Sequence, residues 1–216
     1  MATTVRLVPS NYGRSSNSYV VVSDAENMYA NTDSTTYGSF RGRGGRSSNS
    51  TYYGFLNGFD FTQIPSNANV TSFTVKIKCY RNSNQNTGSS YRIRLASSPS
   101  NNSVISGTTT STDIGTTVDT ITIPTGSLTW ATLSGYGTNF SIEIPLRNTS
   151  TSSSQYPYVY VYGAEIEVTY EEGTTPTSLF RVKNNGSWVT PQKVLVKQNG
   201  SWVEGTVKVK SGGTWH

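Results

Sequence analysis

The sequence predicts an all-β protein: a jelly-roll-like antiparallel β-sandwich followed by a small module of β-hairpin repeats. Apolar and polar side chains alternate along many short segments, and almost no stretch has helical periodicity. Only 13% of the residues are charged, while Ser, Thr, Asn, Gly and Tyr abound, as in exposed strands and turns. Three tight-turn dipeptides near the C-terminus, each between two short alternating runs, predict the hairpins.

Eight or more short strands are expected between residues 1 and 172. The alternation is clearest in "SFTVKIKCY", "YRIRLA" and "NFSIEIPL", where every second side chain is apolar. Further candidate strands cover residues 5–8, 18–22, 52–59, 118–123, 156–162 and 164–170. Antiparallel strands with one buried and one hydrated face have this pattern, and the Gly/Ser/Asn loops between them favour a two-sheet sandwich.

The segment "YPYVYVYGAEIEVTY" allows two interpretations. As one continuous strand, it places its tyrosines on the face of Ala164, Ile166 and Val168, so that they belong to the core. A bulge at Gly163 would instead reverse the alternation and make the tyrosines an outward platform for sugar rings. We adopt the core interpretation and keep the platform as its alternative.

The segment "EEGTTPTS" ends the alternating region and divides the chain. We expect a sandwich domain over residues 1–172, a linker over 173–179 and a repeat module over 180–216. Residues 1–179 hold 11 basic and 11 acidic side chains, whereas residues 180–216 hold six basic side chains against Glu204 alone. The whole net charge of +5 therefore lies on the repeat module, which indicates two modules with separate roles.

The repeat module contains "VKNNGSW", "VKQNGSW" and "VKSGGTW". Their turn dipeptides accept positive φ at both central positions of a type I′ turn. Counting outward from the turns pairs Lys183 with Trp188, Lys197 with Trp202 and Lys210 with Trp215. The same counting pairs Val182 with Val189, Val196 with Val203 and Val209 with His216. Each hairpin thus carries a Lys–Trp pair, which can form a cation–π contact, on one face.

Three hairpins in 37 residues cannot bury enough apolar surface to be stable alone. We expect them to dock on the sandwich, on a second copy of the chain or on a larger particle. The tryptophans either fill that contact or form a ligand-binding ladder. Trp188, Trp202, Trp215, Lys183, Lys197 and Lys210 are therefore candidate partner-binding residues.

The segment "FRGRGGR" places Arg41, Arg43 and Arg46 among glycines. Such a segment can approach a phosphate or a carboxylate closely, so the three arginines are further candidate binding residues. We expect a surface loop here. Specific nucleic-acid binding is not expected, because the surrounding module carries no net charge.

The composition argues against catalysis and metal binding. A single cysteine, Cys79, excludes an intramolecular disulfide and a thiolate cage, and the only histidine, His216, excludes His-dependent triads. Asp24, Glu26 and Asp33 lie close in sequence but match no EF-hand spacing, so we expect solvated carboxylates. We predict no catalytic residue, metal or cofactor.

Targeting signals are not expected either. "MATTVRLVPSNYG" lacks the apolar region of a signal peptide. No apolar run approaches the length of a membrane helix, so we expect no membrane insertion.

The repeats "VKNNGSWVTPQKVLVKQNGSWVEGTVKVKSGGTW" resemble the C-terminal repeats of tailed-bacteriophage minor tail, baseplate and fibre proteins. The larger module is similar to β-sandwich modules of phage structural proteins and bacterial surface proteins. That similarity rests on "YANTDSTTYGSF", "GFLNGFDFTQIPSNANVTSFTVKIKCY", "LTWATLSGYGTNFSIEI" and "VYVYGAEIEVTY". The resemblance implies a structural protein of the virion, assembled in the host cytoplasm.

The expected function is therefore non-enzymatic attachment or display on a phage particle, in the tail, baseplate, fibre or capsid decoration. Expected partners are other virion proteins, further copies of the chain in a homo-oligomer such as the trimers common in fibres, and a host-surface glycan. A carbohydrate-binding module of a bacterial surface protein, with the three tryptophans stacking on sugar, is the alternative. A glycan-cleaving enzyme would require Glu143 or Glu165 as a catalytic carboxylate.

Overall fold

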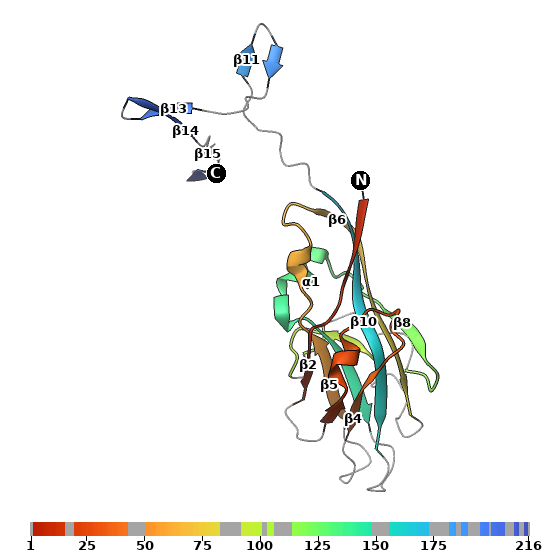
Figure 1. The fold of residues 1–216 in the computed structure, drawn as a ribbon. Coiled ribbons are helices and arrows are strands. Elements are labelled where there is room, and N and C mark those ends of the chain that lie inside the picture. Colours follow the sequence, from red (N-terminus) through yellow and green to blue (C-terminus); the bar gives the residue numbers. More distant parts are fainter. Residues whose placement is uncertain are drawn as a thin grey trace. The chain divides into compact units, whose positions relative to one another are not determined.

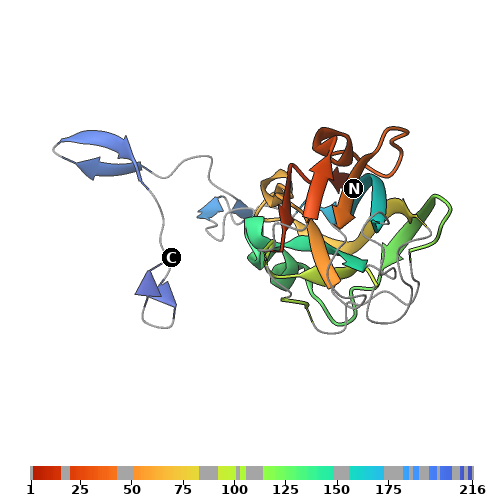
Figure 2. The same cartoon turned by 90° about the horizontal axis from the view of Figure 1, so that it is seen from below.

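A computed structural model describes residues 2–15, 20–42, 51–82, 92–100, 103–105, 114–147, 156–172, 182–184, 187–189, 195–198, 200–205, 210–211 and 214–215. The chain divides into two compact units, Met1–Glu172 and Gly173–His216, which are described separately below. Their elements can be followed in Figure 1 and, from below, in Figure 2. The predicted linker over 173–179 lies outside the described residues.

The first unit is built from two antiparallel sheets, which confirms the predicted all-β class. The larger sheet has the order β3-β4-β10-β6-β8, and β1 also pairs with β10. Its strands are β1 (Ala2–Leu7), β3 (Val20–Ser23), β4 (Gly38–Gly42), β6 (Asn69–Arg81), β8 (Asp119–Ile123) and β10 (Tyr158–Glu171). The smaller sheet has the order β2-β5-β9-β7. Its strands are β2 (Asn11–Arg14), β5 (Thr51–Asn57), β7 (Arg94–Ala96) and β9 (Ser141–Arg147).

Each predicted strand overlaps an observed one, but the sequence does not predict β2 or β4. Both are short and contain glycine, which weakens the alternating pattern. Helical elements are brief: η1 (Ala25–Met28), η2 (Phe61–Gln63), α1 (Trp130–Gly135) and η4 (Gly137–Asn139). Helix α1 begins where the Thr129 hydroxyl accepts a hydrogen bond from the backbone N–H of Thr132.

Apolar side chains from both sheets meet in one core. Phe40 of β4, Ile77 of β6 and Val161 of β10 are fully buried with Leu95 and Ile142 of the smaller sheet. Contact is close at Gly54 of β5, where an added Cβ would lie 2.3 Å from a ring carbon of Phe40. Glycine at this position lets the aromatic ring of one sheet rest on the backbone of the other. The jelly-roll description remains a prediction.

Strand β10 contains a β-bulge that reverses its alternation. Val161 pairs with Cys79 and Gly163 pairs with Lys78, so β10 has one extra residue, Tyr162, at this point. Val159 and Val161 face the core before the bulge, while Ala164, Ile166, Val168 and Tyr170 face it afterwards. The core interpretation of Tyr158, Tyr160 and Tyr162 is therefore wrong. They lie half-buried on the opposite face of the sheet, because the bulge changes the parity.

Gly163 also allows a loop to pack closely against the bulge. The backbone N–H of Ala164 donates a hydrogen bond to the Ala30 carbonyl at 2.9 Å. A Cβ on Gly163 would lie 2.2 Å from the Asn31 carbonyl oxygen and 2.5 Å from that of Ala30. The loop of residues 29–37 is thus held against the outer face of the larger sheet.

The described strands of the second unit form hairpins. They are formed by β11 (Val182–Asn184) with β12 (Ser187–Val189), β13 (Leu195–Gln198) with β14 (Ser201–Glu204) and β15 (Lys210–Ser211) with β16 (Thr214–Trp215). The predicted register is confirmed: Lys183 pairs with Trp188, Lys197 with Trp202 and Lys210 with Trp215. Gly200 has a φ of 84°, as the second central position of a type I′ turn requires. The predicted Val209–His216 pair lies outside the described residues.

Candidate functional site

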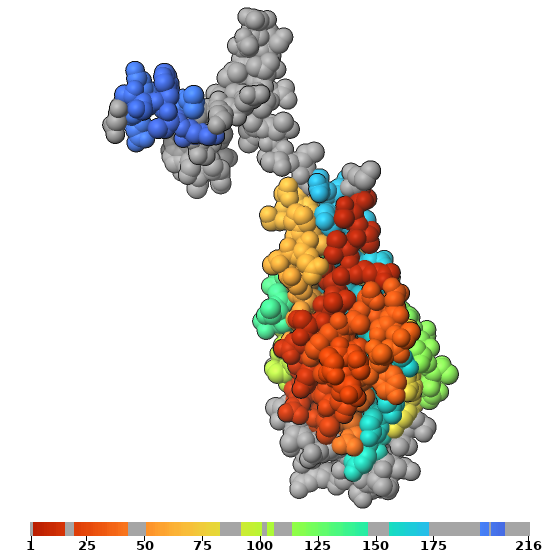
Figure 3. Space-filling model, viewed as in Figure 1, coloured from red at the N-terminus to blue at the C-terminus, as the bar shows by residue number. Residues whose placement is uncertain are grey.

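The outer surface of the larger sheet carries a cluster of aromatic and cationic side chains, which we call the tyrosine face. Its members are Tyr37, Tyr80, Tyr156, Tyr158, Tyr160, Tyr162, Arg41 and Lys78. They come from β4, β6, β10 and the segments that precede β4 and β10. In the space-filling view, the turquoise surface of the first half of β10 lies open beside the orange surface of residues 20–42 (Figure 3).

The rings of the tyrosine face contact one another. Tyr80 and Tyr160 are cross-strand partners whose ring centres lie 4.5 Å apart with planes 13° from parallel, so their faces overlap. Tyr158 lies parallel to Tyr160 at 5.7 Å. Tyr37 meets Tyr160 edge to face at 5.4 Å and Tyr162 at 5.3 Å. Such contacts stabilise by about 0.5–1.5 kcal/mol each and fix the ring positions before any ligand binds.

Cations stand at both ends of the β10 segment. The Arg41 guanidinium lies 5.1 Å from the ring centre of Tyr156 and 5.8 Å from that of Tyr158, whose hydroxyl oxygen accepts its hydrogen bond. The Lys78 ammonium lies 5.4 Å from the ring centre of Tyr162 and donates to the Ser34 carbonyl. These cation–π contacts hold the positive charges beside the rings.

The surroundings favour the neutral form of two phenols of the tyrosine face, Tyr80 and Tyr160. Partial burial, followed by the neighbouring phenols, raises the pKa of Tyr80 and of Tyr160 above the ordinary value of 10.0. A neutral phenol both donates and accepts hydrogen bonds. The face therefore offers ring surface, hydroxyl groups and two positive charges, but no nucleophile or general base.

The loop that presents Tyr37 is tied down by a buried carboxylate. Glu165 follows the bulge on β10, and its side chain is 1% exposed. It accepts hydrogen bonds from the backbone N–H of Thr32 at 3.3 Å and the hydroxyl of Thr32 at 3.1 Å. Arg6 and Lys76 lie 3.8 Å from its oxygens. Glu165 thus anchors the loop and is not available to a substrate.

The structure changes the interpretation of the arginine segment. Arg41 lies in β4, directly opposite Tyr158 of β10, so the predicted surface loop is wrong at this position. The segment forms a strand because β4 pairs with β3 on one side and with β10, which is distant in the sequence, on the other. Arg43 and Arg46 lie outside the described residues.

Of the hairpin candidates, the structure describes the surroundings of Trp202 and Lys197. Trp202 is 67% exposed, and Lys197 opposite it is also exposed. Val196 and Val203, on the other face of this hairpin, are 47% and 37% exposed. For Trp188, Trp215, Lys183 and Lys210 the structure describes the strand pairing alone. The middle hairpin therefore leaves both of its faces accessible.

Sequence reasoning missed Tyr37, Tyr80 and Lys78 as site residues. Tyr80 and Lys78 continue the polar side of "SFTVKIKCY", and an outward tyrosine on that side was a usable signal. Tyr37 gives no comparable signal, because its position depends on the loop held by Gly163 and Glu165. The sequence allowed the interpretation of the β10 tyrosines as an outward platform. Choosing it would have required knowing that the bulge at Gly163 forms.

Glu143 is buried in the smaller sheet. It forms an ion pair with Arg94, and its Oε2 atom has no hydrogen-bond partner in the described structure. Burial raises the pKa of Glu143 above the ordinary 4.5, and the charge of Arg94 opposes this shift. Neither Glu143 nor Glu165, each 0% exposed, reaches the surface as a glycan-cleaving enzyme would need.

The raised pKa of Glu143 makes the stability pH-dependent. A folded-state pKa above the unfolded one gives a stabilising contribution that is present below the unfolded pKa, near 4.5, and is lost as the pH rises through the folded value. We expect the unfolding free energy of the wild type, relative to Glu143→Gln, to fall as the pH rises from 4 to 7. Urea unfolding at several pH values measures this difference, and a rise would contradict the prediction.

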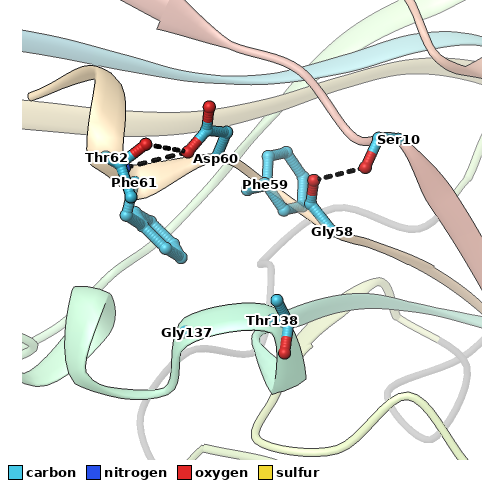
Figure 4. Close-up of a pocket in the computed structure, with 8 residues that line it drawn as sticks. All are labelled: Ser10, Gly58, Phe59, Asp60, Phe61, Thr62, Gly137 and Thr138. Atoms are coloured by element: carbon cyan, nitrogen blue, oxygen red, sulfur yellow. Dashed lines mark hydrogen bonds between the residues drawn. The ribbon is translucent and has the colours of Figure 1, made fainter.

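A shallow pocket of about 340 Å³ is lined by Ser10, Gly58, Phe59, Asp60, Phe61, Thr62, Gly137 and Thr138. Figure 4 shows two of its polar side chains, Ser10 and Asp60, in hydrogen bonds with other lining residues. The Ser10 hydroxyl donates to the Gly58 carbonyl at 2.7 Å, and Asp60 accepts from the hydroxyl and backbone N–H of Thr62. These Thr62 hydrogen bonds lower the pKa of Asp60. These hydrogen bonds engage the Ser10 hydroxyl and one oxygen of the Asp60 carboxylate.

Two other groups that could react, the Cys79 thiol and the Asp33 carboxylate, are held by the surrounding structure. Burial raises the pKa of the Cys79 thiol far above its ordinary value, so the thiol stays protonated. Asp33 pairs with Arg6, and the described residues contain no cluster of three or more His, Cys, Asp or Glu side chains that could hold a metal ion. Within the described part of the chain, no helix has the length and apolarity that crossing a membrane requires.

Comparison with protein-family models, curated proteins and solved structures gives no match.

Proposed function

We propose that this chain is a non-enzymatic structural protein of a tailed-bacteriophage particle that serves attachment or display. It acts in the virion, as a component of the tail, baseplate, fibre or capsid surface. The hairpin unit joins the chain to other copies or to other virion proteins, and the sandwich domain faces a host-surface glycan. The repeat pattern described above motivates the particle, and the exposure of the middle hairpin supports the adhesive role.

The observation that carries this proposal is the exposure of Trp202. Trp202 is 67% exposed on one face of the middle hairpin, and Val196 and Val203 are partly exposed on the other. Together they leave a large apolar area in contact with water. The described strands of each hairpin pair with one another in separate two-stranded sheets. Such hairpins are marginally stable alone. A partner that covers them supplies both stability and binding energy.

Replacing Trp202 tests the adhesive role. Buried tryptophans commonly contribute at least about 2 kcal/mol to an interface, so Trp202→Ala should weaken association roughly 30-fold. Sedimentation velocity of the full chain over a concentration series measures the association, and mass spectrometry of purified particles tests for the chain itself. Val118→Ala, at a 45% exposed apolar residue of the first unit, is the matched control. A chain that stays monomeric, and is absent from particles, would overturn the proposal.

A carbohydrate-binding module of a bacterial surface protein is the second candidate. The tyrosine face favours this candidate, because its aromatic rings and hydroxyl groups suit sugar binding. Such binding does not require that the chain belong to a phage particle. This candidate differs from the first proposal in the role of the hairpins, whose tryptophans would then stack on sugar. Loss of glycan binding in Trp202→Ala, with association unchanged, would favour this candidate.

A further inference from the structure

We propose that the tyrosine face binds an acidic polysaccharide whose carboxylates are attached directly to its sugar rings. This inference rests on the proposed attachment function and names the surface and the ligand class. Three features of the described residues carry it: the presentation of the rings, the position of the charges and the kind of polar groups around them.

The rings form a rigid surface long enough for several contacts. Tyr158 and Tyr160 are two positions apart on β10, about 7 Å along an extended strand, and Tyr162 follows them at the bulge. Tyr80 and Tyr160 overlap, and Tyr37 braces Tyr160 and Tyr162 from the neighbouring loop. Because these contacts exist without a ligand, little side-chain entropy is lost on binding. An extended oligosaccharide matches this elongated array better than a single sugar.

The charges on this surface favour an anion. The cross-strand partners of Tyr158 and Tyr160 are Arg41, Ser39 and Tyr80, and those of Lys78 are Gly163 and Thr120. Among these partnered positions the charged side chains are Arg41 and Lys78, both positive. Each has its charge between 5.1 and 5.8 Å from a tyrosine ring centre. A sugar stacked on such a ring would bring a carboxylate fixed to its own ring close to that cation.

The surrounding groups favour a glycan over a protein partner. The paired positions carry Ser39, Thr120 and the phenol hydroxyls, which suit the many hydroxyl groups of a sugar. Protein interfaces have an apolar central region. Among the described residues of the first unit, the exposed large hydrophobic side chains are Tyr12, Tyr37 and Val118, and of these only Tyr37 belongs to the tyrosine face.

The test is direct binding of the purified full chain to defined saccharides. The probes are oligogalacturonate, alginate and hyaluronan fragments, with methyl-esterified oligogalacturonate as the neutral counterpart and poly(glycerol phosphate) as a phosphate-bearing polymer. The variants are Tyr160→Ala and the double variant Arg41→Gln, Lys78→Gln. Tyr12→Ala, at a 38% exposed tyrosine of the smaller sheet, is the control. Thermal unfolding verifies that each variant folds.

We expect at least one carboxylated probe to bind about tenfold more tightly than the ester, and more weakly as salt is added. Tyr160→Ala and the double variant should each weaken binding about tenfold, whereas Tyr12→Ala should not. If Tyr160→Ala does not fold, the double variant, which keeps every ring, still decides. Binding of no carboxylated probe, preference for the ester or the phosphate polymer, or binding unaffected by these variants would overturn the inference.

A second copy of the chain is the other possible occupant of this face. Self-association lost in Tyr160→Ala but kept in Trp202→Ala would identify that occupant and overturn the inference. The two proposals also fail separately. Absence of glycan binding leaves association through Trp202 intact, and absence of association leaves glycan binding measurable on the monomer.

Discussion

Replacing Gly163 by alanine is expected to destabilise the first unit by about 3 kcal/mol, at the upper end of overpacking effects. The new Cβ would lie 2.2 and 2.5 Å from the backbone oxygens of Asn31 and Ala30. Because these are backbone atoms, no side-chain rotation relieves the clash. Either the loop must move away or the bulge must be lost. The midpoint of urea unfolding, compared with that of the wild type, measures the effect.

Gly135→Ala is the matched control for this substitution. Gly135 ends helix α1, and an added Cβ there meets nothing within 4 Å. Alanine is favoured over glycine in a helix by about 0.5–1 kcal/mol, so this variant should be as stable as the wild type or slightly more so. Equal destabilisation of both variants would contradict the role of close packing at Gly163. Gly163→Ala should in addition weaken saccharide binding, because the same loop carries Tyr37.

The bulge shows where prediction from the sequence reaches its limit. Alternation locates β10 and correctly assigns Ile166 and Val168 to the core. It cannot decide the side of Tyr158, since one extra residue reverses every position before the bulge. The glycine at 163 signals that a bulge is possible. Its formation depends on the carbonyls of residues 30 and 31, which approach from more than a hundred residues away in the chain.

The hairpins were predictable in more detail than the two sheets of the first unit. Their pairing depends on local turn geometry, so counting outward from Asn199-Gly200 gives the Lys197–Trp202 pair that the structure has. By contrast, β4 is held by pairing with β3 and β10, which the local sequence around Arg41 does not reveal. The candidate site combines both kinds of information. Its residue types are visible in the sequence, and their assembly on one face is not.

Glu165→Ala is expected to lower the free energy of unfolding by about 3 kcal/mol, because it removes two hydrogen bonds to a buried carboxylate, each worth about 1.5–3 kcal/mol. Glu165 is almost fully buried, and both of its oxygens accept hydrogen bonds from Thr32. Its loss would remove the anchor of the loop and leave Arg6 and Lys76 with one carboxylate fewer nearby. Urea unfolding measures the loss of stability, and the near-ultraviolet dichroism of the tyrosines should decrease as Tyr37 leaves its neighbours.

The variant Glu167→Ala distinguishes the loss of the hydrogen bonds to the loop from the loss of a negative charge near Arg6 and Lys76. Glu167 contacts the same two cations, at 3.0 Å from Lys76 and 3.8 Å from Arg6, but its side chain is 30% exposed. A partly exposed ion pair contributes at most about 1 kcal/mol, so this variant should stay close to the wild type. Similar losses in both variants would mean that the charge network, and not the hydrogen bonds to Thr32, holds the loop. A large loss in Glu165→Ala alone would explain why the sheet buries a carboxylate there: it fixes the loop that completes the tyrosine face.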